Sequence, residues 1–226
     1  MNGPDSSLVG ERLARVRERV ERAGGPGSHV TVVAVTKGFG PEAVFAAAAA
    51  GLADIGENYA QEMLSKLALA PPGLRWHFLG ELQRNKLARL APHVHLWHGL
   101  DREAEAVALA GLSKGAGVLV EVKAEGGQRR PGVAPAQVPG LVSSARAAGL
   151  SVRGLMTVGP VGVPPAEVAH HFRAVAGLAS SLGLPELSMG MSADFELAVA
   201  EGATMVRIGR ALFGPRPLAR WAPESG

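Results

Sequence analysis

The chain has 226 residues, of which 47% are hydrophobic and 19% charged, and its formal net charge is +3. This composition is that of a globular protein with a sizeable core and excludes a disordered chain. Cysteine is absent, which excludes disulfides and thiolate sites, and aromatic residues at 4% are too few for a surface that stacks nucleic-acid bases.

The first residues become amphipathic and charged almost at once, without the apolar core of a signal peptide. No apolar run along the chain is long enough to cross a membrane. Together with the missing cysteines, this predicts a cytoplasmic protein whose partners are neither membranes nor nucleic acid. An opening helix is expected over Leu8–Ala23, within an N-terminal segment 1–28 that packs on the rest of the chain.

After this helix, short apolar runs alternate with longer amphipathic stretches. The eight expected strands are Val30–Thr36, Ala53–Gly56, Arg75–Leu79, Val94–Gly99, Val118–Val122, Val152–Met156, Glu186–Ser188 and Thr204–Ile208. The helices expected between them are Pro41–Ala50, Tyr59–Leu69, Leu82–Leu90, Arg102–Leu112, Pro135–Ala148, Pro165–Leu182 and Ala193–Ala200. Strands that alternate with helices indicate βαβ units and a parallel sheet. Eight of them favour a single (β/α)8 barrel domain over residues 1–226, with a doubly wound open sheet as the main alternative.

The first expected strand ends in a lysine, within the segment VTVVAVTKGFG from Val30 to Gly40. Such a lysine can simply reach into solvent. An amine held in a partly dry barrel mouth instead loses its proton more readily and becomes a nucleophile toward a carbonyl. Because the chemistry of a barrel lies at the C-terminal ends of its strands, Lys37 is a candidate reactive amine with a lowered pKa.

Two later turns are suited to binding an anion. After the seventh strand, the chain turns through Gly190 into a helix expected to begin near Ser192, whose hydroxyl is an N-cap group. After the eighth strand, Gly209 leads into the short helical piece Arg210–Phe213 and lets the backbone approach a ligand. Two ordinary capped helix starts would have the same pattern. On one rim with Lys37, these turns favour an aldehyde that carries a phosphate, such as pyridoxal 5′-phosphate (PLP).

Five segments together resemble one family. VAVTKG, IGENYAQE, WHFLGELQRNK, GLMTVG and LSMGMSADFELAVAEGATMVRIGRALFG are similar to the pyridoxal phosphate homeostasis proteins, single-domain relatives of the alanine racemase N-terminal barrel. The resemblance extends from about Val32 to Gly214. It implies a TIM-type barrel like the alanine racemase N-terminal domain, with PLP held as an internal aldimine on Lys37. A monomer is expected.

The resemblance also implies the remaining cofactor contacts. Ser192 and the backbone at Gly209 and Arg210 would hold the phosphate, and Arg207 would face the pyridine nitrogen. Position 210 is often a small residue in the family, so this chain would use backbone amides or the Arg210 guanidinium instead. The implied cofactor-binding set is Lys37, Asn58, Met156, Met191, Ser192, Arg207, Gly209 and Arg210.

The same residues bear on whether the chain is an enzyme. An arginine keeps its proton, so Arg207 would leave the pyridine nitrogen unprotonated and weaken the ring as an electron acceptor. The single tyrosine, Tyr59, is expected to pack behind an Asn58 cap, in a capping-box variant with Gln61. We therefore expect a carrier in vitamin B6 homeostasis with little or no turnover, and PLP-dependent apoenzymes as its recipients. A weak PLP-dependent racemase or lyase is the alternative, and a PLP-free interaction protein is a third class.

Histidines cluster in the segment HVHLWH, at His93, His95 and His98. No carboxylate or thiol with ligand spacing accompanies them, so no metal site is expected. His77 is expected in the core, with a position in the barrel mouth as the alternative.

Overall fold

A computed structural model describes residues 4–25, 27–124 and 131–216, so both ends of the expected domain 1–226 lie outside the described residues. Its sheet is a closed barrel of parallel strands that follow one another in chain order. The strands are β1 (Thr31–Val35), β2 (Asp54–Glu57), β3 (Arg75–Phe78), β4 (Val94–Leu100), β5 (Gly117–Val122), β6 (Ser151–Thr157), β7 (Glu186–Met191) and β8 (Met205–Ile208). Because β1 pairs with β8, from Thr31 opposite Met205 to Ala34 opposite Ile208, the open-sheet alternative is excluded and the predicted TIM-type barrel is confirmed.

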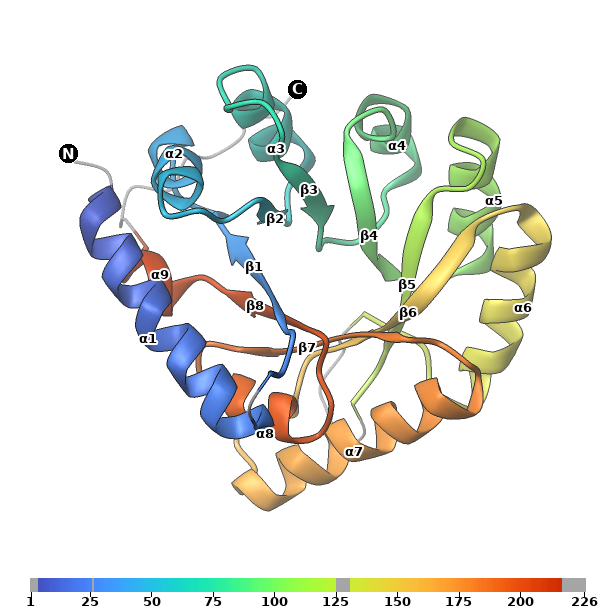
Figure 1. Ribbon diagram of the computed structural model, residues 1–226. Coiled ribbons are helices and arrows are strands. Elements are labelled where there is room, and N and C mark those ends of the chain that lie inside the picture. Colours follow the sequence, from blue (N-terminus) through green and yellow to red (C-terminus); the bar gives the residue numbers. More distant parts are fainter. Residues whose placement is uncertain (1–3, 26, 125–130, 217–226) are drawn as a thin grey trace.

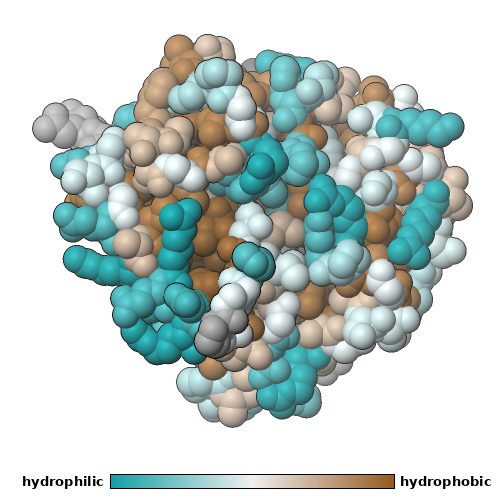
Figure 2. Space-filling model, in the orientation of Figure 1, coloured by the Kyte–Doolittle hydropathy of each residue, from teal (hydrophilic) through white to brown (hydrophobic). Residues whose placement is uncertain are grey.

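The helices form an outer layer around this barrel (Figure 1). They are α1 (Ser6–Gly24), α2 (Pro41–Ala49), α3 (Ala60–Leu67), α4 (Arg84–Leu90), α5 (Glu103–Leu112), the 3-10 turn η1 (Pro135–Gln137), α6 (Val138–Ala148), α7 (Pro165–Ser181), α8 (Phe195–Ala200) and α9 (Arg210–Phe213). None of the described helices is long and apolar enough to span a membrane. Hydrophilic residues cover much of the face seen in Figure 2, and hydrophobic residues are visible between them.

The strands separate two hydrophobic regions. The main core fills the space between the sheet and the helices and includes Trp97, Val120 and Val206. A smaller cluster inside the barrel consists of Leu96, Leu119, Met156 and Met205. Neighbouring residues of a strand point to opposite faces, which is why the strands read as nearly continuous apolar runs.

Helix α1 covers the seam where β8 meets β1. Its buried residues Val9, Leu13, Val16 and Val20 recur at helical spacing, and the helix contacts α2, α8 and α9 (Figure 1). Arg19 of α1 also forms two hydrogen bonds to Glu196 of α8, at 2.6 and 3.0 Å.

Strand β7 is longer than the sequence predicted, since it continues from Ser188 to Met191. Gly190 therefore lies inside the strand rather than in the turn after it. It has φ of +90°, and a Cβ there would lie 2.6 Å from the Ala198 side chain, so glycine is required both for the backbone and for the close approach of α8. The turn after β7 therefore begins beyond Met191 and not at Gly190.

Candidate functional site

Lys37 lies at the C-terminal rim of the barrel, two residues after the end of β1. Gly38 follows with φ of +76°, a left-handed conformation that reverses the chain immediately after the lysine. A Cβ at Gly38 would lie 3.1 Å from Cδ of Arg216, so the Arg216 side chain packs against this glycine. The lysine itself is partly buried.

The surroundings of Lys37 favour its neutral form. Burial lowers the pKa of Lys37, and the positive charges of Arg216 and Arg207 lower it further, against the opposing effect of Glu57 and Glu62. The expected direction of the pKa change is confirmed. Burial is the largest cause, and Arg216 contributes more than the expected neighbour Arg207.

A buried ionic cluster holds the backbone on both sides of Lys37. Nζ of Lys66 lies 2.5 Å from Oε1 of Glu57 and 3.4 Å from Oε2 of Glu62, and it donates to the Thr36 carbonyl at 2.9 Å. The Thr36 hydroxyl donates to Oε1 of Glu57, and the Gly38 N–H donates to Oε2 of Glu62. Three side chains from β2 and α3 thus fix the residues before and after the amine.

This cluster was not predicted from the sequence. Glu62 and Lys66 are four residues apart on a helix, which is the usual spacing of an exposed ion pair, yet their side chains are 4% and 3% exposed. Burial raises the pKa of Glu57, and the Lys66 ammonium and the Thr36 hydroxyl oppose that rise. The only signal available in the sequence was the acid at the end of a buried strand.

The two turns expected to bind an anion are in direct contact, but not in the predicted way. Helix α8 begins at Phe195 and its N-cap residue is Asp194, so the predicted role of Ser192 as its N-cap is wrong. The Ser192 hydroxyl instead accepts a hydrogen bond from the Ala211 N–H of α9, at 3.2 Å. Through this hydrogen bond, Ser192, which directly follows β7, joins the turn after β7 to the turn after β8.

Gly209 and Arg210 begin the short helix α9. The N–H groups of Leu212 and Phe213 donate to the Gly209 carbonyl. The Arg210 N–H, at the first helical position, has no acceptor within the helix, and the Arg210 side chain is exposed. A Cβ at Gly209 would lie 3.2 Å from the Val35 carbonyl of β1, so glycine allows this turn to approach the strand that leads to Lys37.

Arg207 lies inside the barrel, with its side chain pointing across it. Its Nη1 donates to the Ser188 carbonyl at 2.6 Å and to the Ser188 hydroxyl at 2.7 Å, and its Nη2 donates to the Thr157 carbonyl at 2.8 Å. Burial lowers the pKa of Arg207 to about 10, with Glu121 and Asp194 opposing, so the guanidinium remains charged at neutral pH. Its contacts with Ser188 and Thr157 could not be predicted from the sequence.

The other predicted residues surround this mouth. Met191 ends β7 opposite Arg207 and is 37% exposed, whereas Met156 is buried in the cluster inside the barrel. Asn58 follows β2, and its buried Oδ1 atom has no hydrogen-bond partner within the described part of the chain. An unpaired buried acceptor, a partly dry amine and a fixed guanidinium make a donor and acceptor set that suits a polar aromatic aldehyde with an anionic group.

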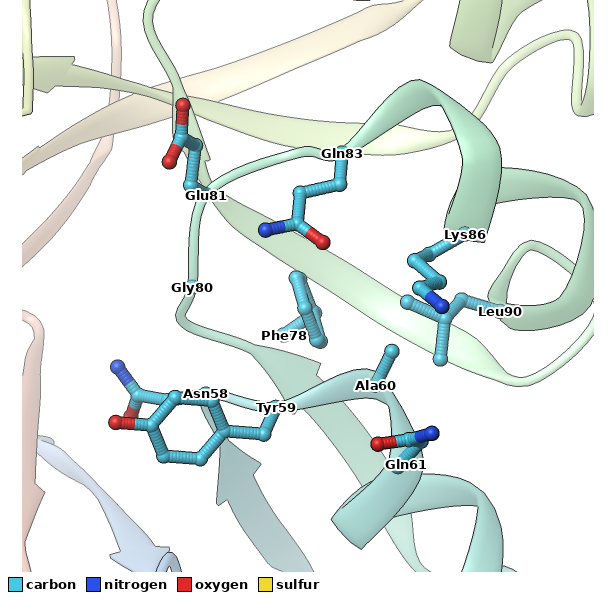
Figure 3. A pocket seen from close by; sticks show the side chains of 10 residues that line it. All are labelled: Asn58, Tyr59, Ala60, Gln61, Phe78, Gly80, Glu81, Gln83, Lys86 and Leu90. Atoms are coloured by element: carbon cyan, nitrogen blue, oxygen red, sulfur yellow. The ribbon is translucent and has the colours of Figure 1, made fainter. Parts of the chain in front are cut away.

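A cavity with a volume of about 350 Å³ adjoins this mouth. Figure 3 shows side chains from the end of β2, the start of α3 and the segment from Gly80 to α4 around it. Its lining residues are Asn58, Tyr59, Ala60, Gln61, Phe78, Gly80, Glu81, Gln83, Lys86 and Leu90. Asn58 alone belongs to the predicted cofactor-binding set, so the cavity lies beside that set and does not contain it.

Tyr59 lies at the edge of this cavity, and its predicted packing is wrong. The expectation placed it behind an Asn58 cap, but Tyr59 is itself the N-cap residue of α3 and is 57% exposed. Its extended backbone, with φ of −119° and ψ of 126°, turns the ring outward. No side-chain hydrogen bond caps the helix, so the capping-box variant is also wrong.

The histidines do not form a metal site in the part of the chain that the structure describes. His93 precedes β4, and His95 is exposed on that strand. His77 and His98 are buried and hydrogen-bonded to each other at 2.9 Å. The prediction of a core position for His77 is confirmed.

Comparisons with known proteins agree with this geometry. The family model described as "Alanine racemase, N-terminal domain" matches residues 11–217. The pyridoxal phosphate homeostasis protein of Deinococcus radiodurans is 42% identical over 205 residues, which are 89% of this chain and 97% of that one. The protein of the same name from Pseudomonas aeruginosa is 43% identical over 220 residues, covering 92% and 94% of the two chains.

A solved structure shows the same fold with a ligand. PipY of Synechococcus elongatus PCC7942, solved with PLP bound, superposes with a TM-score of 0.81 and 35% sequence identity. The match covers 91% of this chain and all of that one.

Proposed function

Because this chain belongs to the family of alanine racemase N-terminal domains, and within it to the pyridoxal phosphate homeostasis proteins, we propose that it binds PLP and takes part in PLP homeostasis. The observation that carries the proposal is the position of Lys37. Its partly buried amine has a lowered pKa and shares one rim with the joined turns at Ser192 and Gly209. The names of the relatives describe homeostasis and not a reaction, in agreement with the expected carrier.

PLP would supply an aldehyde, a phosphate and an aromatic ring that can accept electrons. In its neutral form, which burial favours, the Nζ of Lys37 can add to an aldehyde carbon and, with loss of one water, bind it covalently. Ser192, the Arg210 N–H and the Arg210 guanidinium would hold the phosphate, beside the close turn at Gly209. Arg207 would face the pyridine nitrogen, and Asn58, Met156 and Met191 would line the pocket.

The charge of the Arg207 guanidinium supports a carrier with little turnover. With a pKa of about 10, its guanidinium would give no proton to the pyridine nitrogen of bound PLP near pH 7, so the ring would be a weak electron acceptor. Hydrogen bonds to the Ser188 and Thr157 carbonyls hold the guanidinium in place. Transfer of PLP to apoenzymes, a monomeric state and a cytoplasmic location are further parts of the proposal.

The exposure of Tyr59 favours testing a weak racemase or lyase as the second candidate. A phenol at the edge of the cavity beside Asn58 could act on a substrate proton. If the protein converts single-enantiomer amino acids, and the rate is lost in both Lys37→Ala and Tyr59→Phe, the carrier proposal is wrong. We expect no robust conversion, and PLP uptake by Tyr59→Phe equal to that of the natural sequence.

The main test is covalent trapping of the ligand. The purified protein is incubated with PLP, its visible spectrum is recorded, and it is reduced with borohydride before the modified peptide is mapped by mass spectrometry. We expect the pyridoxyl group on Lys37 and its loss in Lys37→Ala, with Lys114→Ala, an exposed lysine in the described region, as the matched control. A colourless protein, or a tag on another lysine, contradicts the proposal.

A further inference from the structure

Arg207 is one end of a chain of hydrogen bonds that crosses the barrel interior. Its Nη1 lies 2.7 Å from Oγ of Ser188, and this oxygen lies 2.9 Å from Nδ1 of His98. Nε2 of His98 lies 2.9 Å from Nδ1 of His77, whose Nε2 lies 3.0 Å from Oδ1 of Asp54. The chain passes from β8 through β7, β4 and β3 to β2, and each of its five residues is less than a tenth exposed.

With one proton on each imidazole, the ends of this chain determine the direction of every hydrogen bond in it. A guanidinium only donates and an ionised carboxylate only accepts. Arg207 therefore donates to Ser188, which leaves the Ser188 hydroxyl hydrogen for Nδ1 of His98. His98 then carries its proton on Nε2 and donates to His77, and His77 carries its proton on Nε2 and donates to Asp54. This order places one proton on each imidazole, in the Nε2–H tautomer, and gives every ring nitrogen and the Ser188 hydroxyl hydrogen a partner.

Two further observations agree with this order. Burial, the largest cause, lowers the pKa of His98 well below its usual range, which favours the neutral ring. Burial opposes ionisation of Asp54, but hydrogen bonds from His77 and Arg75 outweigh it and hold the pKa of Asp54 at about 2. Asp54 is thus a carboxylate at neutral pH, paired with Arg75 at 2.6 and 2.7 Å.

We propose that Asp54, His77, His98 and Ser188 are positioning residues for Arg207, which orient its guanidinium toward the ligand from the opposite rim of the barrel. Asp54 is the first residue of β2, and Arg207 lies toward the C-terminal end of β8. Hydrogen bonds in a chain polarise one another, so a carboxylate at the far end makes Ser188 a stronger acceptor for Arg207. This role of Arg207 toward PLP rests on the proposed function, whereas the order of the hydrogen bonds does not.

The order is tested on the ligand-free protein by nitrogen NMR of the histidine side chains and of the Arg207 guanidinium. We expect the Nε2–H tautomer for both His77 and His98 at neutral pH, and resolved Nη signals for Arg207 that show slow rotation. In Ser188→Ala, His98 loses the donor at Nδ1, so a mixture of tautomers and faster rotation of the guanidinium are expected. An Nδ1–H tautomer of His98, or an imidazolium at His77, overturns the proposal whether or not PLP binds.

The effect on the ligand is tested with a double-mutant cycle. Asp54→Asn and Ser188→Ala should each weaken PLP binding, by about 10-fold for a lost hydrogen bond to a charged group, and should shift the absorption band of bound PLP. Since both break one chain, the double variant should be no weaker than the worse single variant. Ser188→Thr keeps the hydroxyl and should restore both affinity and absorption band.

Glu186→Gln is the matched control, because Glu186 is also a carboxylate near the start of a strand and is paired with Arg153, but lies outside the chain. Its PLP affinity should equal that of the natural sequence. Additive effects in the cycle, or an equal loss in Glu186→Gln, would mean that Asp54 acts only through stability. If the natural sequence takes up no PLP while the NMR order holds, the proposed function fails and the positioning of Arg207 stands.

Discussion

Burial shifts the pKa values of three side chains in the barrel mouth. It lowers the pKa of the two bases and raises the pKa of the acid. It lowers the pKa of Lys37 and brings that of Arg207 to about 10, because both lose hydration of their charged form. It raises the pKa of Glu121 to about 7, with Asp101 adding to the rise and Arg207 opposing it. One mouth therefore combines an amine that loses its proton more readily than usual with a guanidinium that is charged at neutral pH.

Replacing Arg207 by glutamate should weaken PLP binding by at least about 10-fold, because a charge-assisted donor is exchanged for a negative charge near the phosphate and ring. Absorbance titration with PLP measures the affinity. Arg207→Lys keeps the charge and should retain more of it, and Arg153→Gln, near the start of β6, is the control. An unchanged affinity in Arg207→Glu would show that Arg207 does not face the ligand.

Replacing Glu121 by glutamine should stabilise the protein at pH 8 but not at pH 4. The folded pKa of about 7 lies above the ordinary value for a glutamate, so the folded state binds the proton more tightly than the unfolded chain does. Stability is thus lost as pH rises through about 7, and the amide removes that loss. Denaturant unfolding at both pH values measures the effect, and equal gains at pH 4 and pH 8 would contradict it.

At the level of the elements, strands were predicted better than caps. The order and type of the strands follow from short β-branched runs such as that of β1, and their ends were placed within a few residues of the observed ones. The N-cap role of Ser192 and the packing of Tyr59 failed, because capping was inferred from local residue types. The extension of β7 depends on a close contact of Gly190 with α8. Such a packing contact cannot be predicted from local residue types.

The candidate site was predicted in part for the same reason. Lys37, Ser192 and Gly209 follow strand ends and Arg207 lies near the end of β8, so their neighbourhood on one rim could be predicted from strand order. The contacts beneath them could not. Lys66 has the sequence pattern of an exposed helical pair, and only the direction in which α3 packs on β2 shows that its ammonium is buried under Thr36.

Replacing Lys66 by methionine should destabilise the fold by about 3–5 kcal/mol, because it leaves two buried carboxylates without their cation. Adding Glu57→Gln should recover part of the loss. The control is Arg22→Met, which removes a pair of the same i,i+4 spacing whose side chains are 68% and 66% exposed, and which should cost less than about 1 kcal/mol. Chemical unfolding measures all three, and equal losses in Lys66→Met and Arg22→Met would contradict the burial of the cluster.

At the scale of the whole molecule, stability depends on closing the sheet. The first and last strands pair with each other, and α1 covers that seam through its contacts with α2, α8 and α9. The helix precedes β1 in the sequence, so it adds to the outer layer a helix that has no preceding strand of its own. The seam is held by hydrophobic contact and by the Arg19–Glu196 pair.

Replacing Leu13 of α1 by alanine should lower the free energy of unfolding by about 2–5 kcal/mol, since this leucine is 2% exposed and would leave a cavity at the seam. Arg15→Ala, two residues away on the outer face of the same helix, should change it by less than about 0.5 kcal/mol. Urea unfolding compares the two. Equal values would mean that α1 adds little to the closed barrel.

The pairing of β1 with β8 also bears on the synthesis of the protein. Lys37 leaves the ribosome long before Ser192 and Gly209, and the rim that joins them exists only once β8 has docked on β1. An unfinished polypeptide therefore exposes an ordinary solvated amine and has no pocket in which to retain an aldehyde. A chain that stops before β8 should therefore be unable to take up PLP.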